Sequence, residues 1–324
     1  MARTRLGFDM GSSSLKVAVL HGESLRVEQV GLPEELRDEN GALRTQDVPP
    51  FLRQVRRKLR LPMAPAALVL PRSQTVCRLV AMPPMPAAQI QASLPGEFAG
   101  VLQGGPDQYQ WGCWACTATA EEREKGRLPV IAAAMARQKL EAYREMFARA
   151  GVRIREFLPQ ELSILRLTAG RGEEALCFVD LGHRRTRVTV VCGDRLRVTK
   201  RITLGGRHLD RVVADELGVD AGTADDYKRS NHQNILSAPS VQVLCERIAA
   251  EILKSVSYYH RAYRPGRLRG VYLTGGGASL PPLRYAIAAA TGLELLDPGT
   301  LIPGAGEMAA AALFAVGAAL PGLG

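Results

Sequence analysis

Three consecutive serines lie near the start of the chain, beside one carboxylate and one glycine, in a segment (residues 7–20) that reads GFDMGSSSLKVAVL. Gly11 has no side chain, so a bulky anion can approach the backbone there. Hydroxyl groups beside backbone N–H groups are the donors that phosphate oxygens require. Asp9 would repel phosphate, but a carboxylate next to a phosphate suits a hydrated Mg²⁺ ion. A phosphate-binding hairpin is one interpretation, and an ordinary polar turn between two strands is the other.

The same pattern returns about half a chain later, where residues 178–191 read FVDLGHRRTRVTVV. Asp180 and Gly182 have the spacing of Asp9 and Gly11, and valines again alternate along the second arm as they would in a strand. An internal repeat of this kind predicts two similar halves, each of which offers a loop to one ligand.

A third element, rich in glycine, lies near the end of the chain. Residues 270–279 (GVYLTGGGAS) predict an apolar strand that ends in three glycines, and a helix begins at residues 280–283. Two Asp-Gly hairpins followed by such a turn resemble the actin/Hsp70/sugar-kinase superfamily of nucleotide-binding proteins, over essentially the whole chain. The resemblance implies that the hairpins grip phosphates from either side and that the late glycine turn lies against the adenosine.

The hydrophobic periodicity of the remaining chain predicts the elements that hold these loops. The predicted fold class is α/β, a bilobed actin-like ATPase fold with two related mixed-sheet lobes. An α+β subdomain is inserted in the first lobe and a helical subdomain in the second. The predicted boundaries are 1–75 and 157–174 for the first lobe core, 76–156 for the inserted subdomain, 175–205 and 265–324 for the second lobe core, and 206–264 for the helical subdomain.

The inserted module resembles that of the PilM family of type IV pilus assembly, and the cell-division homologue FtsA shares the layout. FtsA-like proteins are usually longer and finish with a basic amphipathic membrane helix, whereas this chain ends in alanine and glycine. The resemblance therefore favours PilM. It rests on residues 97–98 after a proline-rich turn, on RAGV at 149–152, on ITLGG at 202–206 and on ADDYK at 224–228.

The resemblance also implies roles for individual residues. Glu161 lies where the superfamily keeps the residue that orients the attacking water; an acid that merely begins a helix is the alternative. Asp225 and Lys228 match an acidic-x-x-Lys pair near ribose and base, although Lys228 could also be a surface lysine. The His-Arg-Arg loop at 183–185 departs from the family pattern, which leaves the rate of hydrolysis open. The implied catalytic residues are Asp9, Asp180 and Glu161, with both aspartates on the metal, and the implied cofactor-binding residues are Gly11, Ser12, Ser13, Ser14, Lys16, Gly182, Thr186, Asp225, Lys228, Gly275, Gly276, Gly277 and Ala278.

The implied function is a cytoplasmic scaffold that binds ATP and Mg²⁺, with at most slow ATPase activity. In the PilM family, the inserted module and the first lobe grip the N-terminal cytoplasmic tail of a PilN-like single-span membrane protein. Such a partner would bring this chain to the inner face of the cell membrane. Other pilus platform proteins, a motor ATPase and a second copy of the chain are further partners, and secretion or DNA-uptake machinery is an alternative setting. The alternative functions are an FtsA-like filament former, a small-molecule kinase of the same superfamily and a nucleotide-free interaction protein.

Composition narrows the classes of partner. The 324 residues are 46% hydrophobic and carry a formal charge of +10, which fits a two-domain globular chain. The charge suits nucleic acid, an anionic membrane or an acidic partner, but no nucleic-acid-binding motif is evident, so nucleic acid is disfavoured. Residues 51–61 predict an amphipathic helix whose basic face either docks on anionic lipid or is simply solvated. No signal peptide or membrane span is expected, and the pair Cys113 and Cys116 lacks the four ligands of a zinc site.

Overall fold

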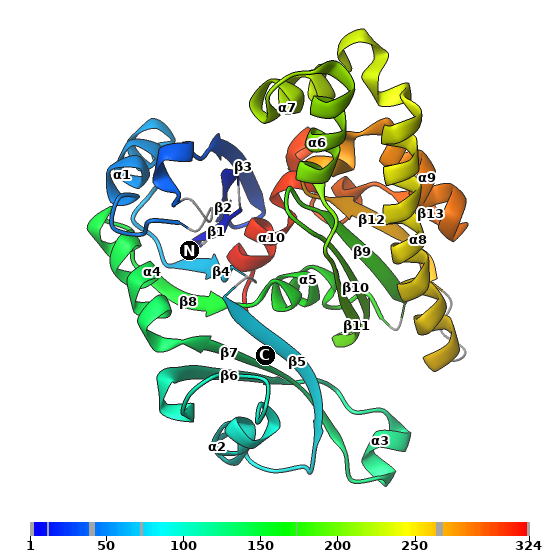
Figure 1. Cartoon of the computed structure of the whole chain (residues 1–324). Coiled ribbons are helices and arrows are strands. Elements are labelled where there is room, and N and C mark those ends of the chain that lie inside the picture. The colour runs from blue at the N-terminus through cyan, green and yellow to red at the C-terminus, as the bar shows by residue number, and fades with distance from the viewer. Residues whose placement is uncertain are drawn as a thin grey trace. The chain divides into compact units, whose positions relative to one another are not determined.

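The computed structural model describes residues 3–11, 13–38, 43–71, 74–172, 174–263 and 268–322. The chain divides into two compact units, and Figure 1 shows its course. Unit 1 contains residues 1–169, 194–196 and 314–324, and unit 2 contains residues 170–193 and 197–313. The helices are α1 (Pro49–Lys58), α2 (Ala87–Glu97), α3 (Ala120–Glu124), α4 (Arg137–Arg149), α5 (Gln160–Thr168), α6 (Gly206–Leu217), α7 (Ala221–Ser230), α8 (Pro239–Ala262), α9 (Pro281–Thr291) and α10 (Ala309–Ala319).

A five-stranded sheet forms the centre of unit 1, with the strand order β3-β2-β1-β4-β8. The first three strands make an antiparallel meander, while β4 runs parallel to both β1 and β8. Parallel strands need a long crossover connection, and the chain between β4 and β8 contains a second sheet. The strands of the first sheet are β1 (Thr4–Met10), β2 (Ser14–His21), β3 (Ser24–Gly31), β4 (Ala66–Val69) and β8 (Ile154–Leu158).

The two faces of this sheet are covered differently. Alternate residues such as Leu6 and Phe8 face α1 and α4, and the rings of Phe8 and Phe147 meet edge to face at 5.1 Å. On the opposite face Gly7 packs directly against the backbone of Ala315 in α10, which leaves no room for a side chain. The C-terminal part of α10 in turn packs closely against α5, where Gly317 meets the backbone of Ser163. Asp9 alternates with Phe8 and so shares the face of Gly7.

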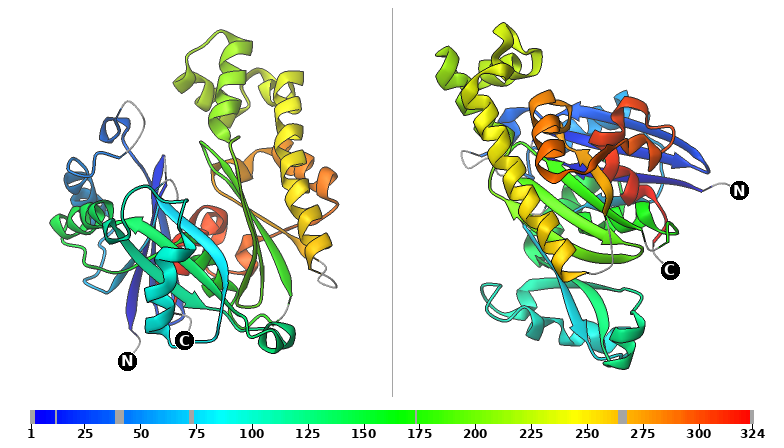
Figure 2. Two further views of the ribbon diagram at one scale, coloured as in Figure 1. Left: turned by 60° about the horizontal axis from the view of Figure 1, so that its bottom comes forward. Right: turned by 90° about the vertical axis from the view of Figure 1, so that its right-hand side faces the viewer.

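The second sheet of unit 1 has three antiparallel strands in the order β5-β7-β6. Its strands are β5 (Thr75–Met82), β6 (Tyr109–Ala115) and β7 (Leu128–Ala136). One face packs on α2, where Ile90, Leu94 and Phe98 form a small core with Val80 and Val130. Figure 2 shows this sheet and α2 together. This layer is the core of the predicted inserted subdomain.

The boundary of the inserted subdomain differs from the predicted 76–156. The second sheet ends at Ala136; α4 buries Leu140, Tyr143 and Phe147 in the core of the first sheet, and β8 pairs with β4. Residues 137–156 therefore belong with the first lobe core. Periodicity predicts that a helix has an apolar stripe, but it does not say which sheet the stripe will cover.

Unit 2 has its own five-stranded sheet, with the order β11-β10-β9-β12-β13. Helices α6, α8 and α9 bury their apolar stripes on one face of it, and Figure 2 shows α8 running along the sheet. Among the described residues, no helix is both long and apolar enough to span a bilayer. The strands are β9 (Ala175–Leu181), β10 (Thr186–Cys192), β11 (Arg195–Ile202), β12 (Leu268–Thr274) and β13 (Glu294–Leu296), and short 3₁₀ turns lie at Glu34–Leu36, Pro106–Gln108, His232–Ser237, Gly276–Ser279, Pro298–Thr300 and Gly306–Met308.

Candidate functional site

The hairpin of β1 and β2, here called hairpin 1, places the first set of predicted ligands at one end of the unit 1 sheet. Asp9 pairs with Lys16 across the hairpin, and the N–H of Gly11 donates to the carbonyl of Ser14 over 2.9 Å. A Cβ at Gly11 would lie 2.9 Å from the amine of Lys16, so the lysine side chain folds over the glycine. Ser14 is buried and Ser13 is exposed, while Ser12 lies outside the described residues. The hairpin thus gathers an amine, a hydroxyl and a carboxylate around an open glycine.

Strand register places Glu161 at the same end of the unit 1 sheet. Asp9 is level with Val69 of β4, and Val69 is level with Leu158 of β8. Asp9 and Leu158 are therefore about 10 Å apart, two strand spacings, and Glu161 lies three residues further on in the fully buried first turn of α5. The carboxyl ends of parallel strands are where α/β sheets bind ligands. Three parallel strands thus bring Asp9 and Glu161 to one edge.

The hairpin of β9 and β10, hairpin 2, repeats the geometry of hairpin 1 within unit 2. Asp180 pairs with Arg187 as Asp9 does with Lys16, and the N–H of Gly182 donates to the carbonyl of Arg185 over 3.1 Å. Arg187 approaches the carboxylate of Asp180 to 3.8 Å. The sequence repeat therefore corresponds to a repeated backbone turn with an acid and a base at the same positions.

Thr186 is placed differently from the other predicted ligands. It lies opposite Leu181, whereas Asp180 lies opposite Arg187, so the two pairs point to opposite faces of hairpin 2. Thr186 is fully buried beside the apolar core of α6 and α8 and occupies the position of Leu15 in hairpin 1. This placement argues against the predicted contact between the Thr186 hydroxyl and phosphate.

The late glycine turn packs on hairpin 2. Thr274, the last residue of β12, is level with Asp180 of the parallel strand β9. A Cβ at Gly275 would lie 2.7 Å from an oxygen of Asp180, and one at Gly277 would lie 2.9 Å from the Cβ of Leu181. Gly275 also has a φ of +79°, which favours glycine. The turn therefore brings Gly275 against Asp180 and Gly277 against Leu181, while Ala278 is buried and Gly276 faces open space.

The first turn of α6 clamps hairpin 2 from its other side. The N–H groups of Gly206 and Arg207 donate to the carbonyls of Gly182 and His183, over 3.0 Å and 2.7 Å. Gly205 lies so close that a Cβ would come within 2.5 Å of the backbone nitrogen of Arg185. Hairpin 2 is thus held by backbone contacts with α6.

An ion cluster joins hairpin 2 to α6 and α7. Lys228 is only 5% exposed and donates both to Asp210 of α6 and to Asp225, the latter over 2.6 Å. His183 lies 3.5 Å from Asp210, and Arg229 donates to Asp225 over 2.8 Å. The predicted pair of Asp225 and Lys228 is therefore an internal ion pair, and the lysine is a buried residue rather than a surface one.

Burial decides two of the pKa values in this cluster. Burial raises the pKa of Asp210, although the hydrogen bond and charge of Lys228 act to lower it. Burial also lowers the pKa of His183, although the negative charge of Asp210 acts to raise it. Burial would also raise the pKa of Asp225, but the hydrogen bonds and charges of Lys228 and Arg229 together lower it. The cluster thus favours a neutral His183.

Sequence reasoning missed Asp210. It lies between the buried residues Leu209 and Val213 on the inner side of α6. An acid within an apolar stripe predicts a buried cationic partner, because a lone buried charge is costly. Lys228 is that partner, and the position of Asp210 in the stripe was the available signal.

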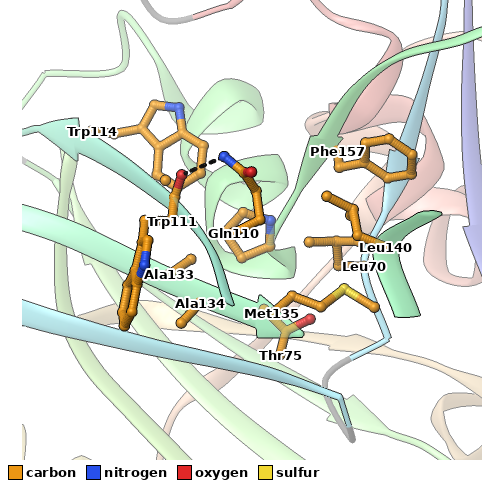
Figure 3. Close-up of a pocket in the computed structure, with 12 residues that line it drawn as sticks. Leu70, Thr75, Gln110, Trp111, Trp114, Ala133, Ala134, Met135, Leu140 and Phe157 are labelled. Atoms are coloured by element: carbon orange, nitrogen blue, oxygen red, sulfur yellow. Dashed lines mark hydrogen bonds between the residues drawn. The ribbon is translucent and has the colours of Figure 1, made fainter. Parts of the chain in front are cut away.

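Unit 1 also contains an apolar hollow of about 70 Å³, lined by both sheets. The ring of Trp114 in β6 lies on one side, and Leu140 and Phe157 lie on the other, with Gln110 between them (Figure 3). Trp111 also borders the hollow, but its ring packs on Phe98 in the α2 core, with the ring centroids 5.3 Å apart. The ring of Trp114 lies over Gly112, where a Cβ would approach it to 3.2 Å. Six free cysteines are distributed through the chain, and the described residues contain no metal-binding group of three or more histidines, cysteines and acids.

Comparison with known proteins places the chain among pilus proteins and their structural relatives. A sequence model of the family described as Type IV pilus assembly protein PilM matches residues 117–313, more than half of the chain. A search of curated protein sequences found no match. The solved PilM-PilN type IV pilus biogenesis complex matches with a TM-score of 0.83 at 18% identity, over 97% of this chain and 97% of that chain. Ethanolamine utilization protein EutJ from Carboxydothermus hydrogenoformans matches with a TM-score of 0.60 at 16% identity, over 99% of this chain and 89% of that chain. These likenesses confirm the predicted α/β actin-like ATPase fold.

Proposed function

The chain belongs to the PilM family of type IV pilus assembly proteins, and from this premise we propose that it is a nucleotide-binding scaffold for a PilN-like membrane protein. Two features support the proposal: the repeated hairpins in units 1 and 2, and the apolar hollow in unit 1. The first concerns the nucleotide and the second concerns the partner, so each has its own test.

Hairpins 1 and 2 suit the phosphates of Mg-ATP. Each ends in an acid, a glycine and a base at matching positions, at the carboxyl ends of parallel strands. Asp9 and Asp180 would hold the hydrated metal, and Lys16 would meet a phosphate as a charge-assisted donor. When bound, the metal neutralises phosphate charge. Glu161, buried at the same edge as Asp9, would orient a water and hold its proton.

Isothermal titration calorimetry with Mg-ATP tests the nucleotide part. Asp9→Asn and Asp180→Asn each remove one metal-holding charge with little change of shape, so each should weaken binding about tenfold or more, most strongly in Mg²⁺. Asp107→Asn, in an exposed turn of the second sheet, is the matched control. Equal affinity of all four proteins would refute the assignment of the hairpins.

The hollow suits an apolar side chain from the tail of a PilN-like protein. Its walls include Leu70, Leu140, Phe157 and the ring of Trp114, and Gln110 offers a polar group among them. Ligand sites of this kind are mostly apolar with a few polar groups that fix orientation. The likeness to a PilM-PilN complex supports the same assignment. Binding such a tail would bring the chain to the inner face of the membrane.

The chain contains its own reporter for this contact. The ring of Trp114 lines the hollow, whereas the ring of Trp111 packs on Phe98 at 5.3 Å in the α2 core. A tail peptide that enters should therefore change the intrinsic fluorescence of Trp114 without any label. Ala133→Leu fills the hollow from β7 and should abolish the change, while Ala120→Leu in the exposed α3 should not. Normal binding by Ala133→Leu would place the peptide elsewhere.

A further inference from the structure

Helix α1 presents an unbalanced basic surface. Its apolar residues Leu52, Val55 and Leu59 are buried in the core of unit 1, which leaves the rest of the helix to solvent. The helix contains no acidic residue. Arg53 and Arg56 are used internally: Arg53 donates to the carbonyl of Arg149 over 3.0 Å, and Arg56 lies against Gly151. The other basic residues of this segment, Arg57, Lys58 and Arg60, are exposed.

Neighbouring acids do not neutralise this surface. Glu145 forms an ion pair with Arg149 of α4, with 3.8 Å between nitrogen and oxygen. Asp47 precedes the N-terminal end of α1, whereas the basic residues lie at its C-terminal end. Among the residues that the structure describes, no carboxylate pairs with Arg57, Lys58 or Arg60. Their charge therefore faces solvent together.

The end of α1 holds an arginine at a position that favours glycine. Arg60 has a φ of +49°, and the N–H of Leu61 donates back to the carbonyl of Arg56 over 3.0 Å. This is the left-handed residue that follows a helix, which is usually glycine because other side chains are strained there. Backbone strain at an exposed residue is a reason to ask what its side chain does.

An exposed apolar side chain stands beside these charges. Met63 lies three residues after Arg60 and is 87% exposed, more than the other large apolar side chains among the residues that the structure describes. Three residues of chain span at most about 11 Å, so the exposed thioether lies near the exposed end of α1 that carries the basic groups. Basic side chains around an exposed apolar group are typical of segments that lie on a lipid bilayer.

We propose that Arg57, Lys58, Arg60 and Met63, here called the α1 patch, contact the anionic phospholipids of a membrane directly. The basic groups complement the negative surface of the bilayer, and Met63 enters the boundary between headgroups and acyl chains. Nucleic acid would use the charges but has no use for Met63. This contact requires no protein partner, so it stands apart from the proposed function.

Vesicle flotation with the full chain tests the proposal, without nucleotide or partner. Vesicles of phosphatidylcholine are compared with vesicles that contain 30% phosphatidylglycerol, at about 0.1 M and 0.5 M salt. We expect binding only to the anionic vesicles, weakened by salt. Arg57→Gln/Lys58→Gln/Arg60→Gln should reduce it about 100-fold. The control Arg211→Gln/Arg247→Gln/Arg261→Gln removes the same charge from exposed positions of α6 and α8 in unit 2 and should bind as the unmodified chain.

Two single variants separate lipid binding from folding. Arg60→Gly relieves the strained backbone, so its melting temperature should stay or rise while binding falls about fivefold. Met63→Ser should also lower binding about fivefold and leave the effect of salt unchanged. Equal loss in both triple variants, or equal binding to both kinds of vesicle, would overturn the proposal. Binding of a DNA duplex through the α1 patch without vesicle binding would assign it to nucleic acid instead.

Discussion

Hairpins 1 and 2 share one backbone design but differ in what surrounds them. Each pairs an acid with a base and closes its turn with a hydrogen bond from glycine. Hairpin 1 carries serines, and a Cβ added at Gly11 would meet only Ser14 and the flexible end of Lys16. Its turn is held by single hydrogen bonds, from the Arg37 side chain to the Gly11 carbonyl over 3.2 Å and from the Leu32 N–H to the Ser13 carbonyl over 2.9 Å. Hairpin 2 carries His183 and two arginines, and it is gripped by the backbone of α6 and by the late glycine turn. Hairpin 1 therefore keeps space beside its glycine, whereas hairpin 2 is packed closely between the backbone of α6 and the late glycine turn.

The difference suggests a division of labour. Hydroxyl and amine donors that need little rearrangement suit phosphate binding, so hairpin 1 should supply most of the affinity for nucleotide. Hairpin 2 is coupled through His183 and α6 to the ion cluster of Asp210, Lys228 and Asp225. A movement of the hairpin 2 turn should therefore displace α6 and α7, and loss of the ion cluster should change the position of the turn.

The largest effect is expected from Lys228→Met. The buried amine satisfies two carboxylates, and its removal leaves Asp210 and Asp225 without it. Removing one partner of a buried ion pair costs about 3–5 kcal/mol of unfolding free energy, which urea denaturation at pH 8 would measure. Lys228→Met/Asp210→Asn should be less destabilised than the single variant, because one of the stranded charges is gone. A loss below about 1 kcal/mol in the single variant would show that hairpin 2 does not depend on the cluster.

The same variant should show a pH dependence. Burial already raises the pKa of Asp210, and loss of the lysine raises it further. Because the pKa of Asp210 is higher in the folded state than in the unfolded chain, the folded state binds more protons between the two pKa values. The free energy of unfolding therefore falls as pH rises through the raised pKa. The deficit of Lys228→Met relative to the unmodified chain should therefore be smallest in acid and largest at neutral pH and above.

Two alanine substitutions, at Gly11 in hairpin 1 and at Gly205 where α6 packs on hairpin 2, should separate a turn with space beside it from a turn packed against backbone. A Cβ at Gly205 would meet backbone atoms of Arg185 and Gly182 at 2.5 Å and 2.6 Å, and backbone cannot move aside. Gly205→Ala should cost about 3 kcal/mol, as overpacked positions do. Gly11→Ala meets the flexible end of Lys16 and should cost under about 1 kcal/mol. Chemical denaturation measures both, and similar losses would mean that hairpin 1 is braced as well.

The sequence predicted those parts of the site in which chain order dictates geometry. The spacing of Asp9, Gly11 and Lys16 sets the register of a short hairpin, and its repeat at Asp180 reproduced the same turn. Alternation along a strand also places Thr186 on the face of Val188 and Val190 of β10, away from the face of Asp180 and Arg187. The predicted bounds of the inserted subdomain differ from the observed ones because α4 packs on the first sheet and β8 pairs within it. Both placements depend on contacts between residues that are distant in sequence.

The sequence could not predict the bracing of hairpin 2. Arg185 and Gly205 are close because β10 and β11 return the chain to the start of α6, and no local pattern encodes that approach. The burial of Lys228 likewise depends on α6 and α7 packing together. Local motifs predict which residues face a ligand. Tertiary packing determines which of these residues are fixed in place by neighbouring elements.

Loss of the basic group should affect nucleotide affinity unequally in the two hairpins. Lys16 folds over the open glycine, so Lys16→Met removes a charge-assisted bond to phosphate and should weaken Mg-ATP binding about 10- to 100-fold. Arg187 lies 3.8 Å from Asp180 and shares its charge with that acid, so Arg187→Met should cost about threefold. Calorimetry measures both. The reverse order would assign the dominant phosphate contact to hairpin 2, and unchanged affinity in both would remove the hairpins from the nucleotide site.

The smallest effect concerns the pH response of hairpin 2. Burial lowers the pKa of His183, so the folded state binds fewer protons than the unfolded chain near pH 6.5, and stability falls as pH drops below that value. His183→Gln removes this response while keeping a polar side chain beside Asp210. The side chain is 41% exposed, so solvent screens the effect to about a few tenths of a kcal/mol between pH 7.5 and pH 5.5. His208, whose pKa burial also lowers, provides the comparison, since His208→Gln should leave the contribution of His183 intact. An unchanged pH slope in His183→Gln would show that burial does not lower the pKa of His183 enough to affect the stability of the folded chain.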